Sequence, residues 1–212
     1  MNFFITGTDT DCGKTFVTAL LVRTARAAGI DVLGAKPVCC GPRDDVAALS
    51  AANGGADPLD ALNPIWLQTP AAPRACELLG EPSPDYEAAL FAMRTLASRH
   101  EHFLCEGAGG WLVPLRAGYT IADLAIALGW PVLLVVGNKL GALNHALLTV
   151  QGVRSSGLKL AGVILNDIVP PDGPAACTNR QVLEEALGFR VLAHVGYGAS
   201  DLSIPSLLTT PV

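Results

Sequence analysis

Residues 7–15 read GTDTDCGKT, a glycine-bounded stretch that ends in Gly-Lys-Thr. It follows a short apolar run, NFFIT at 2–6, and it leads into a helical pattern at 14–28. A glycine-rich loop between a strand and a helix is typical of phosphate binding, because its backbone N–H groups and the helix dipole converge on an anion. The usual G-x-x-x-x-G-K-[ST] pattern has four residues between its glycines, whereas this loop has five.

The residues of this loop suit phosphate chemistry. Gly7 and Gly13 permit backbone conformations that a Cβ atom would hinder. Lys14 offers a mobile cation to the outer phosphates, and the Thr15 hydroxyl is a ligand for Mg²⁺. An ordinary strand-to-helix turn also contains glycine, but it does not need Gly-Lys-Thr at the joint. We therefore expect the loop to bind the phosphates of a nucleotide.

Apolar runs alternate with helical patterns along the chain, as in proteins with a parallel sheet buried on both faces. The patterns predict strands at 2–6, 30–38, 103–110, 132–136, 158–167 and 189–195, and helices at 14–28, 86–98, 120–128, 143–155 and 177–186. The Pro-, Gly- and Asp-rich stretch 42–84 is expected to mix short helices and loops. We expect one α/β domain over residues 1–212, a doubly wound, mainly parallel sheet flanked by helices, with ligands at the carboxyl ends of the strands.

The composition narrows the class of protein. Fourteen basic and 19 acidic residues give a net charge of -5 without a basic run, so nucleic acid is not an expected partner. The longest apolar run, at 130–137, is too short to span a bilayer, and no cationic stretch precedes the apolar N-terminal residues. Six cysteines without a C-x-x-C pair predict free thiols in a reducing cytoplasm. His100 and His102 are expected at a solvated edge, not in a metal site.

Three residues outside the loop could add to its chemistry. Glu106 ends the apolar run FLCE and could reach a metal held near Thr15, although a strand-end glutamate is often only solvated. Lys36 stands at the end of the second predicted strand, and a doubly wound sheet would place it beside the phosphate loop. Asp45 is either the N-cap of a helix or a further Mg²⁺ ligand, and from its local sequence alone the cap is favoured.

Six stretches, in order and spacing, resemble one family. They are GTDTDCGKT (7–15), KPV (36–38), EGAGGWLVPL (106–115), ADLA (122–125), GNKLGALNHALLT (137–149) and GVILNDIVPP (162–171). The chain resembles the dethiobiotin synthetases of the biotin pathway from residue 3 to about 171, and the long glycine loop is a feature of that family. The resemblance implies a P-loop NTPase-like fold and a homodimeric cyclo-ligase. Such an enzyme uses Mg²⁺ to convert diaminopelargonic acid, CO₂ and ATP into dethiobiotin, ADP and phosphate.

The resemblance also implies roles for individual residues. The catalytic residues are Lys36, which would stabilise a carbamate anion, and Lys14, which would offset charge on the γ-phosphoryl group. Mg²⁺ falls to Thr15, Asp45 and Glu106. ATP falls to Asp11, Cys12, Gly13, Lys14, Thr15, Phe16, Glu106, Gly107, Ala108, Gly109, Asn166 and Asp167, with Asn166 at the adenine edge. The substrate falls to Thr10, Lys36, Cys40, Gly141, Ala142, Leu143 and Asn144. The last four would hold its remote carboxylate across a dimer interface, although residues 141–144 also fit a simple helix start.

This chain departs from the family pattern at several positions. KPVCCG has Cys40 where the family carries a substrate-contacting serine, and a thiol is a weaker hydrogen-bond donor. Asp11 replaces a commoner glutamate, and Arg74 stands where histidine is frequent. After Pro171 the resemblance fades, and the expected adenine-side loop at 193–198 lacks the usual proline.

Two other classes of protein share the phosphate loop. A P-loop ligase of the cobyrinate-synthetase type normally continues into a glutaminase domain, whereas this sequence ends at 212. A nucleotide-switched partition-type ATPase usually carries a lysine early in the loop, where this sequence has Thr8, Asp9 and Thr10. Both alternatives are therefore disfavoured.

Overall fold

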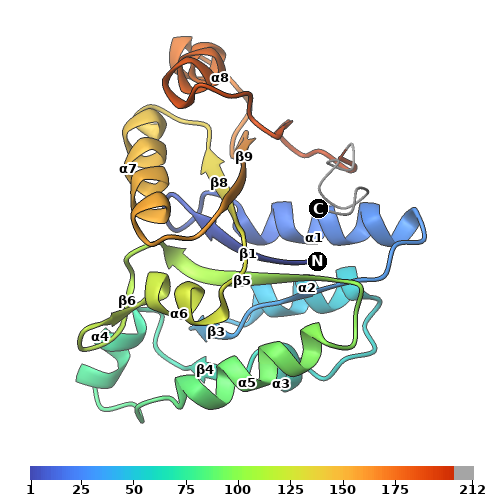
Figure 1. Ribbon diagram of the computed structural model, residues 1–212, viewed down its shortest axis with the longest axis vertical. Helices are drawn as coiled ribbons and strands as arrows, with labels where there is room; N and C mark the ends of the chain where they lie inside the picture. Colours follow the sequence, from blue (N-terminus) through green and yellow to red (C-terminus); the bar gives the residue numbers. More distant parts are fainter. Residues whose placement is uncertain (203–212) are drawn as a thin grey trace.

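The computed structural model describes residues 1–202, and its central element is a six-stranded sheet (Figure 1). Its strands are β1 (Asn2–Gly7), β2 (Val32–Ala35), β5 (His102–Gly110), β8 (Val132–Gly137), β9 (Leu160–Asn166) and β10 (Ala193–Val195). The order across the sheet is β10-β9-β8-β1-β5-β2, and every neighbouring pair is parallel. The chain fills one side of β1 and then the other, which confirms the predicted doubly wound α/β class. The carboxyl ends of β5, β1 and β8 consequently lie side by side.

Helices cover both faces of the sheet. The long ones are α1 (Lys14–Ala27), α2 (Asp44–Asn53), α5 (Tyr86–Ala97), α6 (Ile121–Leu128), α7 (Ala142–Ser155) and α8 (Pro174–Leu187). α1 and α2 pack on the face to which Phe3 and Ile5 point, and α5 to α8 pack on the face of Phe4. Because successive strand side chains point to opposite faces, a strand covered on both sides is apolar throughout. In the part of the chain that the structure describes, no helix has the length and apolar character to cross a membrane.

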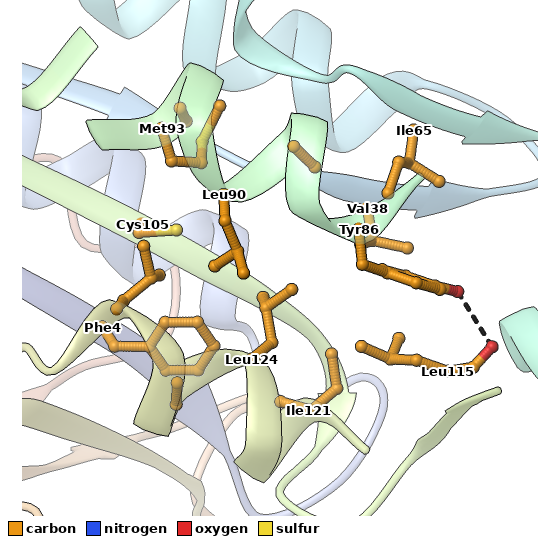
Figure 2. Packing of buried hydrophobic residues seen from close by; sticks show 14 of the residues in the cluster. Phe4, Val38, Ile65, Tyr86, Leu90, Met93, Cys105, Leu115, Ile121 and Leu124 are labelled. Atoms are coloured by element: carbon orange, nitrogen blue, oxygen red, sulfur yellow. Dashed lines mark hydrogen bonds between the residues drawn. The ribbon is translucent and has the colours of Figure 1, made fainter. Parts of the chain in front are cut away.

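The core on the Phe4 face joins the elements that carry the site, as Figure 2 shows. Tyr86, at the start of α5, donates its hydroxyl to the backbone oxygen of Leu115 at 2.8 Å. Leu115 lies in β6 (Pro114–Arg116), which pairs antiparallel with β7 (Tyr119–Thr120). A Cβ atom at Gly107 would lie 2.9 Å from Phe4 Cζ. Gly107 is therefore required for the packing of β5 against its neighbours.

The chain leaves the main sheet at Lys36, so the strand predicted over 30–38 is wrong in extent. Lys36 N donates to Leu62 O, and Ile65 N donates to Pro37 O, both at 3.0 Å. The chain continues as β3 (Val38–Cys40), which pairs parallel with β4 (Ile65–Leu67) in a separate two-stranded sheet. Two short helices, α3 (Leu59–Leu62) and α4 (Pro73–Leu78), complete this segment. The prediction of short helices and loops missed β4 and the ten-residue α2.

Element ends differ from prediction mainly beyond residue 157. α8 begins at Pro174, before the predicted residue 177, because proline has the backbone angle that the first helical position needs. β9 begins at Leu160, and β10 is limited to three residues, shorter than the stretches 158–167 and 189–195.

A buried asparagine closes the free edge of β2. Asn53, at the end of α2, accepts from Gly34 N at 2.9 Å and donates to Gly34 O at 2.8 Å. These are the bonds that a further strand would make. Asn53 therefore satisfies the edge strand just before the chain turns to Lys36.

Replacing Asn53 by Ala should lower the free energy of unfolding by about 2–4 kcal/mol, because two buried backbone groups of Gly34 lose their partners. Urea denaturation measures this loss. Gln151→Ala, at an exposed position of α7, is the control and should change stability by less than about 0.5 kcal/mol. A loss as small as that of the control would show that Gly34 does not depend on this side chain.

Candidate functional site

The loop between β1 and α1 has the backbone of an anion-binding turn. Gly13 is the N-cap of α1 and has φ +84°, and Asp11 has φ +58°. Within residues 1–202, Asp11 is the one non-glycine residue with a positive φ. Positive φ values interspersed with right-handed residues turn successive N–H groups toward one point, where the N-terminus of α1 adds its dipole. The loop therefore has the form that phosphate binding requires.

Cys12, inside the loop, packs closely against two glycines of neighbouring strands. A Cβ atom on Gly7 would lie 2.4 Å from Cys12 Sγ, and one on Gly137, at the end of β8, would lie 3.1 Å from Cys12 Cα. The Lys14 ammonium turns back to the loop and donates to Asp9 O at 2.9 Å. Lys14 is thus already directed toward the space that the loop encloses.

Asn166, the last residue of β9, holds the loop by a hydrogen bond. Its amide nitrogen donates to Cys12 O at 3.0 Å, and a Cβ atom on Gly13 would lie 2.1 Å from that nitrogen. Asn166 Oδ1 is buried and has no hydrogen-bond partner among the described residues. The side chain therefore supports the phosphate loop and keeps one acceptor free.

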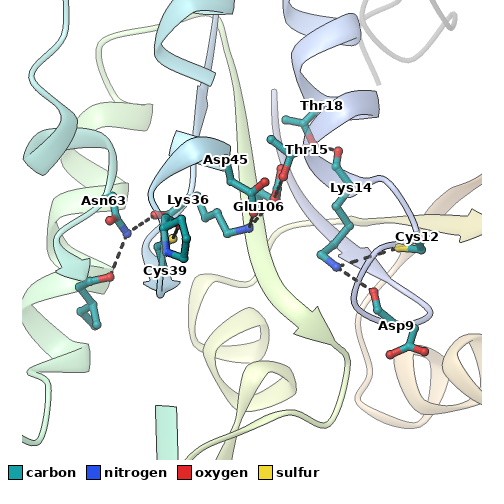
Figure 3. Close-up of polar contacts among 12 residues, drawn as sticks. Asp9, Cys12, Lys14, Thr15, Thr18, Lys36, Cys39, Asp45, Asn63 and Glu106 are labelled. Carbon is teal, nitrogen blue, oxygen red and sulfur yellow. Dashed lines mark hydrogen bonds and ion pairs between the residues drawn. The ribbon is translucent and has the colours of Figure 1, made fainter. Parts of the chain in front are cut away.

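Lys36 lies between two carboxylates, as Figure 3 shows. Its ammonium donates to Asp45 Oδ2 at 2.5 Å and to Glu106 Oε1 at 2.9 Å. Thr15, the second residue of α1, donates its hydroxyl to the same Glu106 oxygen at 2.6 Å. Glu106 is fully buried, and its Oε2 has no hydrogen-bond partner in residues 1–202. Four predicted site residues therefore form one cluster at the ends of β2 and β5.

The cluster is held together by charge. Burial disfavours the ammonium form of Lys36, but Glu106 and Asp45 outweigh burial and raise its pKa above the ordinary 10.5. Burial likewise opposes ionisation of Asp45, while Lys36 lowers the pKa of that carboxyl below 3.8. The Lys36–Asp45 ion pair thus stabilises the fold across neutral pH. Its contribution is lost as the pH falls through the lowered pKa of Asp45 or rises through the raised pKa of Lys36.

Two cavities meet at this cluster. One, of about 280 Å³, is lined by the phosphate loop and the start of α1, including Asp11, Gly13, Lys14, Thr15 and Phe16. The other, of about 350 Å³, is lined by Cys39, Cys40, the stretch 70–73, Ala108 and Val113. Both cavities share Thr10, Lys36, Asp45 and Gly109. A molecule in one cavity would therefore face a molecule in the other across Lys36.

Other predicted residues lie apart from these cavities. Gly141, with φ +88°, is the N-cap of α7, and residues 141–144 line neither cavity. Asp167 follows Asn166 at the end of β9, where it accepts from the Asn138 amide and contacts His194. Within one chain, the structure does not bring residues 141–144 to the rest of the predicted substrate residues.

Several local predictions are wrong. Asp45 is not a helix N-cap, because α2 begins at Asp44 with Arg43 as its cap. His102 is buried instead of solvated, while His100 pairs with Asp31 at 2.8 Å. The predicted position of Lys36 beside the phosphate loop is confirmed, although β5 lies between β2 and β1 in the sheet. Lys36 is linked to the start of α1 by Glu106 of β5, whose Oε1 accepts hydrogen bonds from both Lys36 and Thr15.

Two parts of the site have no clear signal in the sequence. The stretch 70–73 lines the second cavity, and a Cβ atom on Gly41 would lie 2.8 Å from Pro70 Cβ. Cys40 lies against the buried Cys76, and burial together with this thiol raises its pKa to about 12. The only sequence signal for the stretch 70–73 was the Pro-rich composition of residues 42–84. The buried Asn138 and Asn179 were likewise not predicted as functional residues.

Comparison with known proteins agrees with this geometry. The AAA domain family matches residues 1–200. FtsY of Thermotoga maritima superimposes with a TM-score of 0.61 at 17% identity, over 100% of this chain and 69% of that one. A ParA family ATPase of Chlorobium tepidum superimposes with a TM-score of 0.54 at 12% identity, over 92% of this chain and 84% of that one. At such identities the two structures show the fold alone, which is that of the P-loop nucleoside triphosphatases.

Sequence relatives define the family within that class. The ATP-dependent dethiobiotin synthetase BioD of Akkermansia muciniphila is 40% identical over 207 residues, which cover 98% of this chain and 97% of that protein. The BioD of Anaeromyxobacter dehalogenans is 45% identical over 180 residues, which cover 83% of this chain and 81% of that protein. The chain belongs to the ATP-dependent dethiobiotin synthetase family. The similarity continues past residue 171, so the predicted limit of the resemblance was too early.

Replacing Gly13 by Ala should reduce ATP affinity by about a hundredfold or more, because alanine at positive φ costs about 1–2 kcal/mol and its methyl group would displace Asn166. Binding of a fluorescent ATP analogue measures this loss. Gly29→Ala is the matched control, since Gly29 has φ +80° but open space around its Cβ position. Equal nucleotide affinity in both variants would contradict the role given to the Gly13–Asn166 contact.

Proposed function

We propose that this chain closes the cyclic urea of dethiobiotin from diaminopelargonic acid, CO₂ and ATP, with release of ADP and phosphate. The observation that carries the proposal is the shared wall of the two cavities, formed by Thr10, Lys36, Asp45 and Gly109. Attack of a bound anion on a γ-phosphoryl group requires the two reactants to approach within about 3–3.5 Å. Adjoining nucleotide and substrate cavities would allow that approach.

The second cavity suits an aliphatic diamine. Its wall carries apolar side chains from residues 70–73, Ala108 and Val113, which fit the alkyl chain of diaminopelargonic acid. The Cys40 thiol, with its raised pKa, stays protonated at neutral pH and can act as a weak hydrogen-bond donor or acceptor. We assign the diamine end of the substrate to the side of this cavity that Lys36 lines.

The chemistry needs positioning and charge, and no protein nucleophile. One substrate amine adds to CO₂ and loses a proton, which gives a carbamate anion that the Lys36 ammonium stabilises. A carbamate oxygen attacks the γ-phosphorus, the bond to ADP breaks, and Lys14 offsets the charge on the transferred group. The second amine then attacks the carbonyl carbon of the carbamic–phosphoric anhydride, phosphate leaves, and the ring closes.

The Lys36 cluster also provides ligands that fit Mg²⁺. Two carboxylates and a hydroxyl, from Asp45, Glu106 and Thr15, are the hard oxygen donors that this ion prefers, with phosphate oxygens and water completing its shell. The buried Glu106 Oε2, which has no hydrogen-bond partner within residues 1–202, supports this assignment. Mg²⁺ bound there would neutralise phosphate charge. Since Lys36 holds both carboxylates, the metal and the ammonium compete for the same negative charge.

Asn166 and Asp167 are proposed to contact the nucleotide base. The amide nitrogen of Asn166 is used by Cys12 O, so Oδ1 is the atom that remains to accept a bond from an exocyclic amine such as that of adenine. Asp167 keeps its second carboxylate oxygen free of the bonds to Asn138 and His194.

A second copy of this chain is proposed to cover the start of α7. Leu140, Leu147 and Leu148 are exposed there beside Asn144, and Leu112 is exposed after β5. Four exposed leucines on neighbouring segments favour an interface between copies. Such an interface would allow residues 141–144 of one copy to hold the remote carboxylate of a substrate bound in the other. This arrangement would explain why they line neither cavity of their own chain.

The purified protein with diaminopelargonic acid, bicarbonate and Mg-ATP should form dethiobiotin, with one ADP released for each product molecule. Lys36→Met should abolish product, because the carbamate loses its cation, while affinity for an ATP analogue stays within about threefold. Mass spectrometry of the product and analogue titration measure the two quantities. ATP hydrolysis indifferent to the diamine, or near-normal turnover in Lys36→Met, would contradict the proposal.

Replacing Leu148 by Arg should convert a dimer into monomers, because it buries a charge in an apolar interface. Sedimentation velocity at micromolar concentration measures the change, with Leu78→Arg, at an exposed position of α4, as the control. The variant should also raise the KM for diaminopelargonic acid. A wild-type protein that is monomeric yet fully active would refute the proposed interface.

A further inference from the structure

Two buried asparagines lie outside both cavities and outside every role assigned so far. Asn138, just after β8, and Asn179, in α8, are 3% and 4% exposed. Asn179 Nδ2 donates to Asn138 Oδ1 at 2.9 Å, and Asn138 Nδ2 donates to Asp167 Oδ1 at 2.7 Å. Buried amides are costly unless they are hydrogen-bonded, so this network has one favoured arrangement.

At one end the network reaches the phosphate loop. Asn138 N donates to Asn166 O at 2.7 Å, in addition to the bond from its side chain to Asp167. Asn166 in turn holds Cys12 O. Asn138 is therefore bonded to Asn166, which supports the loop, and to the adjacent Asp167.

At the other end the network reaches the start of α7. Asn179 Nδ2 also donates to Lys139 O at 3.0 Å, and the same oxygen accepts from Ala142 N at 3.1 Å. Lys139 O thus lies in the turn that leads through Gly141 into α7. A bond from α8 to this oxygen fixes the turn from outside.

Apolar packing holds the α7 side of this turn, where Ala142 is 2% exposed, but not its Leu140 side. Leu140 is 87% exposed, and a cavity of about 380 Å³ is lined by residues 138–140 and by the stretch 169–176, where Asn138 Nδ2 donates to Ala176 O at 3.1 Å. With open space beside the turn, its position relies on hydrogen bonds. The Asn179 bonds to Lys139 O and to Asn138 Oδ1 are supplied to this segment by a side chain of another helix, α8.

We propose that Asn179, acting with Asn138, is a positioning residue that sets the first turn of α7 relative to the phosphate loop. The inference rests on the proposed function, in which residues 141–144 hold the substrate carboxylate. Asn179 touches neither substrate nor nucleotide. It fixes where residues 141–144, including the Asn144 side chain, stand when the nucleotide side is in place.

Asn179→Ala removes the bonds to Lys139 and Asn138 without opposing helix formation in α8. The KM for diaminopelargonic acid should rise about tenfold, while kcat and the KM for ATP stay within about twofold. Amide hydrogen exchange at residues 141–144 should become about tenfold faster in the same variant. Gln181→Ala, an exposed position of α8, is the control and should change neither quantity.

Asn138→Leu, which fills similar space without the amide, provides a second variant should the first fail to fold. It should give at least the same rise in KM for the diamine. The double variant should be no worse than Asn138→Leu alone, because both changes break one chain of contacts. A uniform loss of kcat with unchanged KM, or additive effects of the two changes, would overturn the inference and indicate a merely structural role.

Asn144→Ala separates this inference from the proposed function. If it raises the KM for the diamine while Asn179→Ala does not, the inference fails and the carboxylate assignment stands. If Asn144→Ala leaves that KM unchanged, the carboxylate assignment fails and the inference falls with it. Support requires that both variants raise KM and that residues 141–144 exchange faster in Asn179→Ala.

Discussion

The bridge of Lys36 between Asp45 and Glu106 is the interaction on which the rest of the site depends. Glu106 is fully buried, and a buried carboxylate without a partner costs several kcal/mol, so Lys36 is required before any ligand arrives. Lys36 directly follows β2, Glu106 lies within β5, and Asp45 lies in the first turn of α2, so these side chains connect three elements. Because Lys36 also lines both cavities, the same ammonium that stabilises the empty fold is available to a bound anion.

The phosphate loop is fixed by contacts made from other strands. Gly7 and Gly137 allow Cys12 to pack without a clash, and Asn166 ties Cys12 O from the end of β9. These contacts keep Thr15 within hydrogen-bond distance of Glu106. The loop and the ion-pair cluster are consequently one rigid unit. The Asn138–Asn179 network extends that unit to α7.

The sequence predicted the sheet class and the phosphate loop because both have strong local signatures: apolar runs buried on both faces, and glycines beside Lys-Thr. It also raised Lys36, Asp45 and Glu106 as candidates from their local pattern, and the family resemblance then gave each of them a role. It did not reveal that β5 separates Lys36 from β1, since strand order depends on long-range pairing. The stretch 70–73 and Asn179 were missed because their roles depend on contacts with residues far away in the chain.

The central claim is that the Lys36 ammonium and a divalent cation share the charge of Asp45 and Glu106. Titration of the nucleotide-free protein with Mn²⁺, followed by electron paramagnetic resonance, tests it directly. Without the ammonium the two carboxylates are left for the metal, so Lys36→Met should bind Mn²⁺ about tenfold more tightly than the wild type or better. Equal or weaker Mn²⁺ binding by this variant, in protein shown to be folded, would contradict the account.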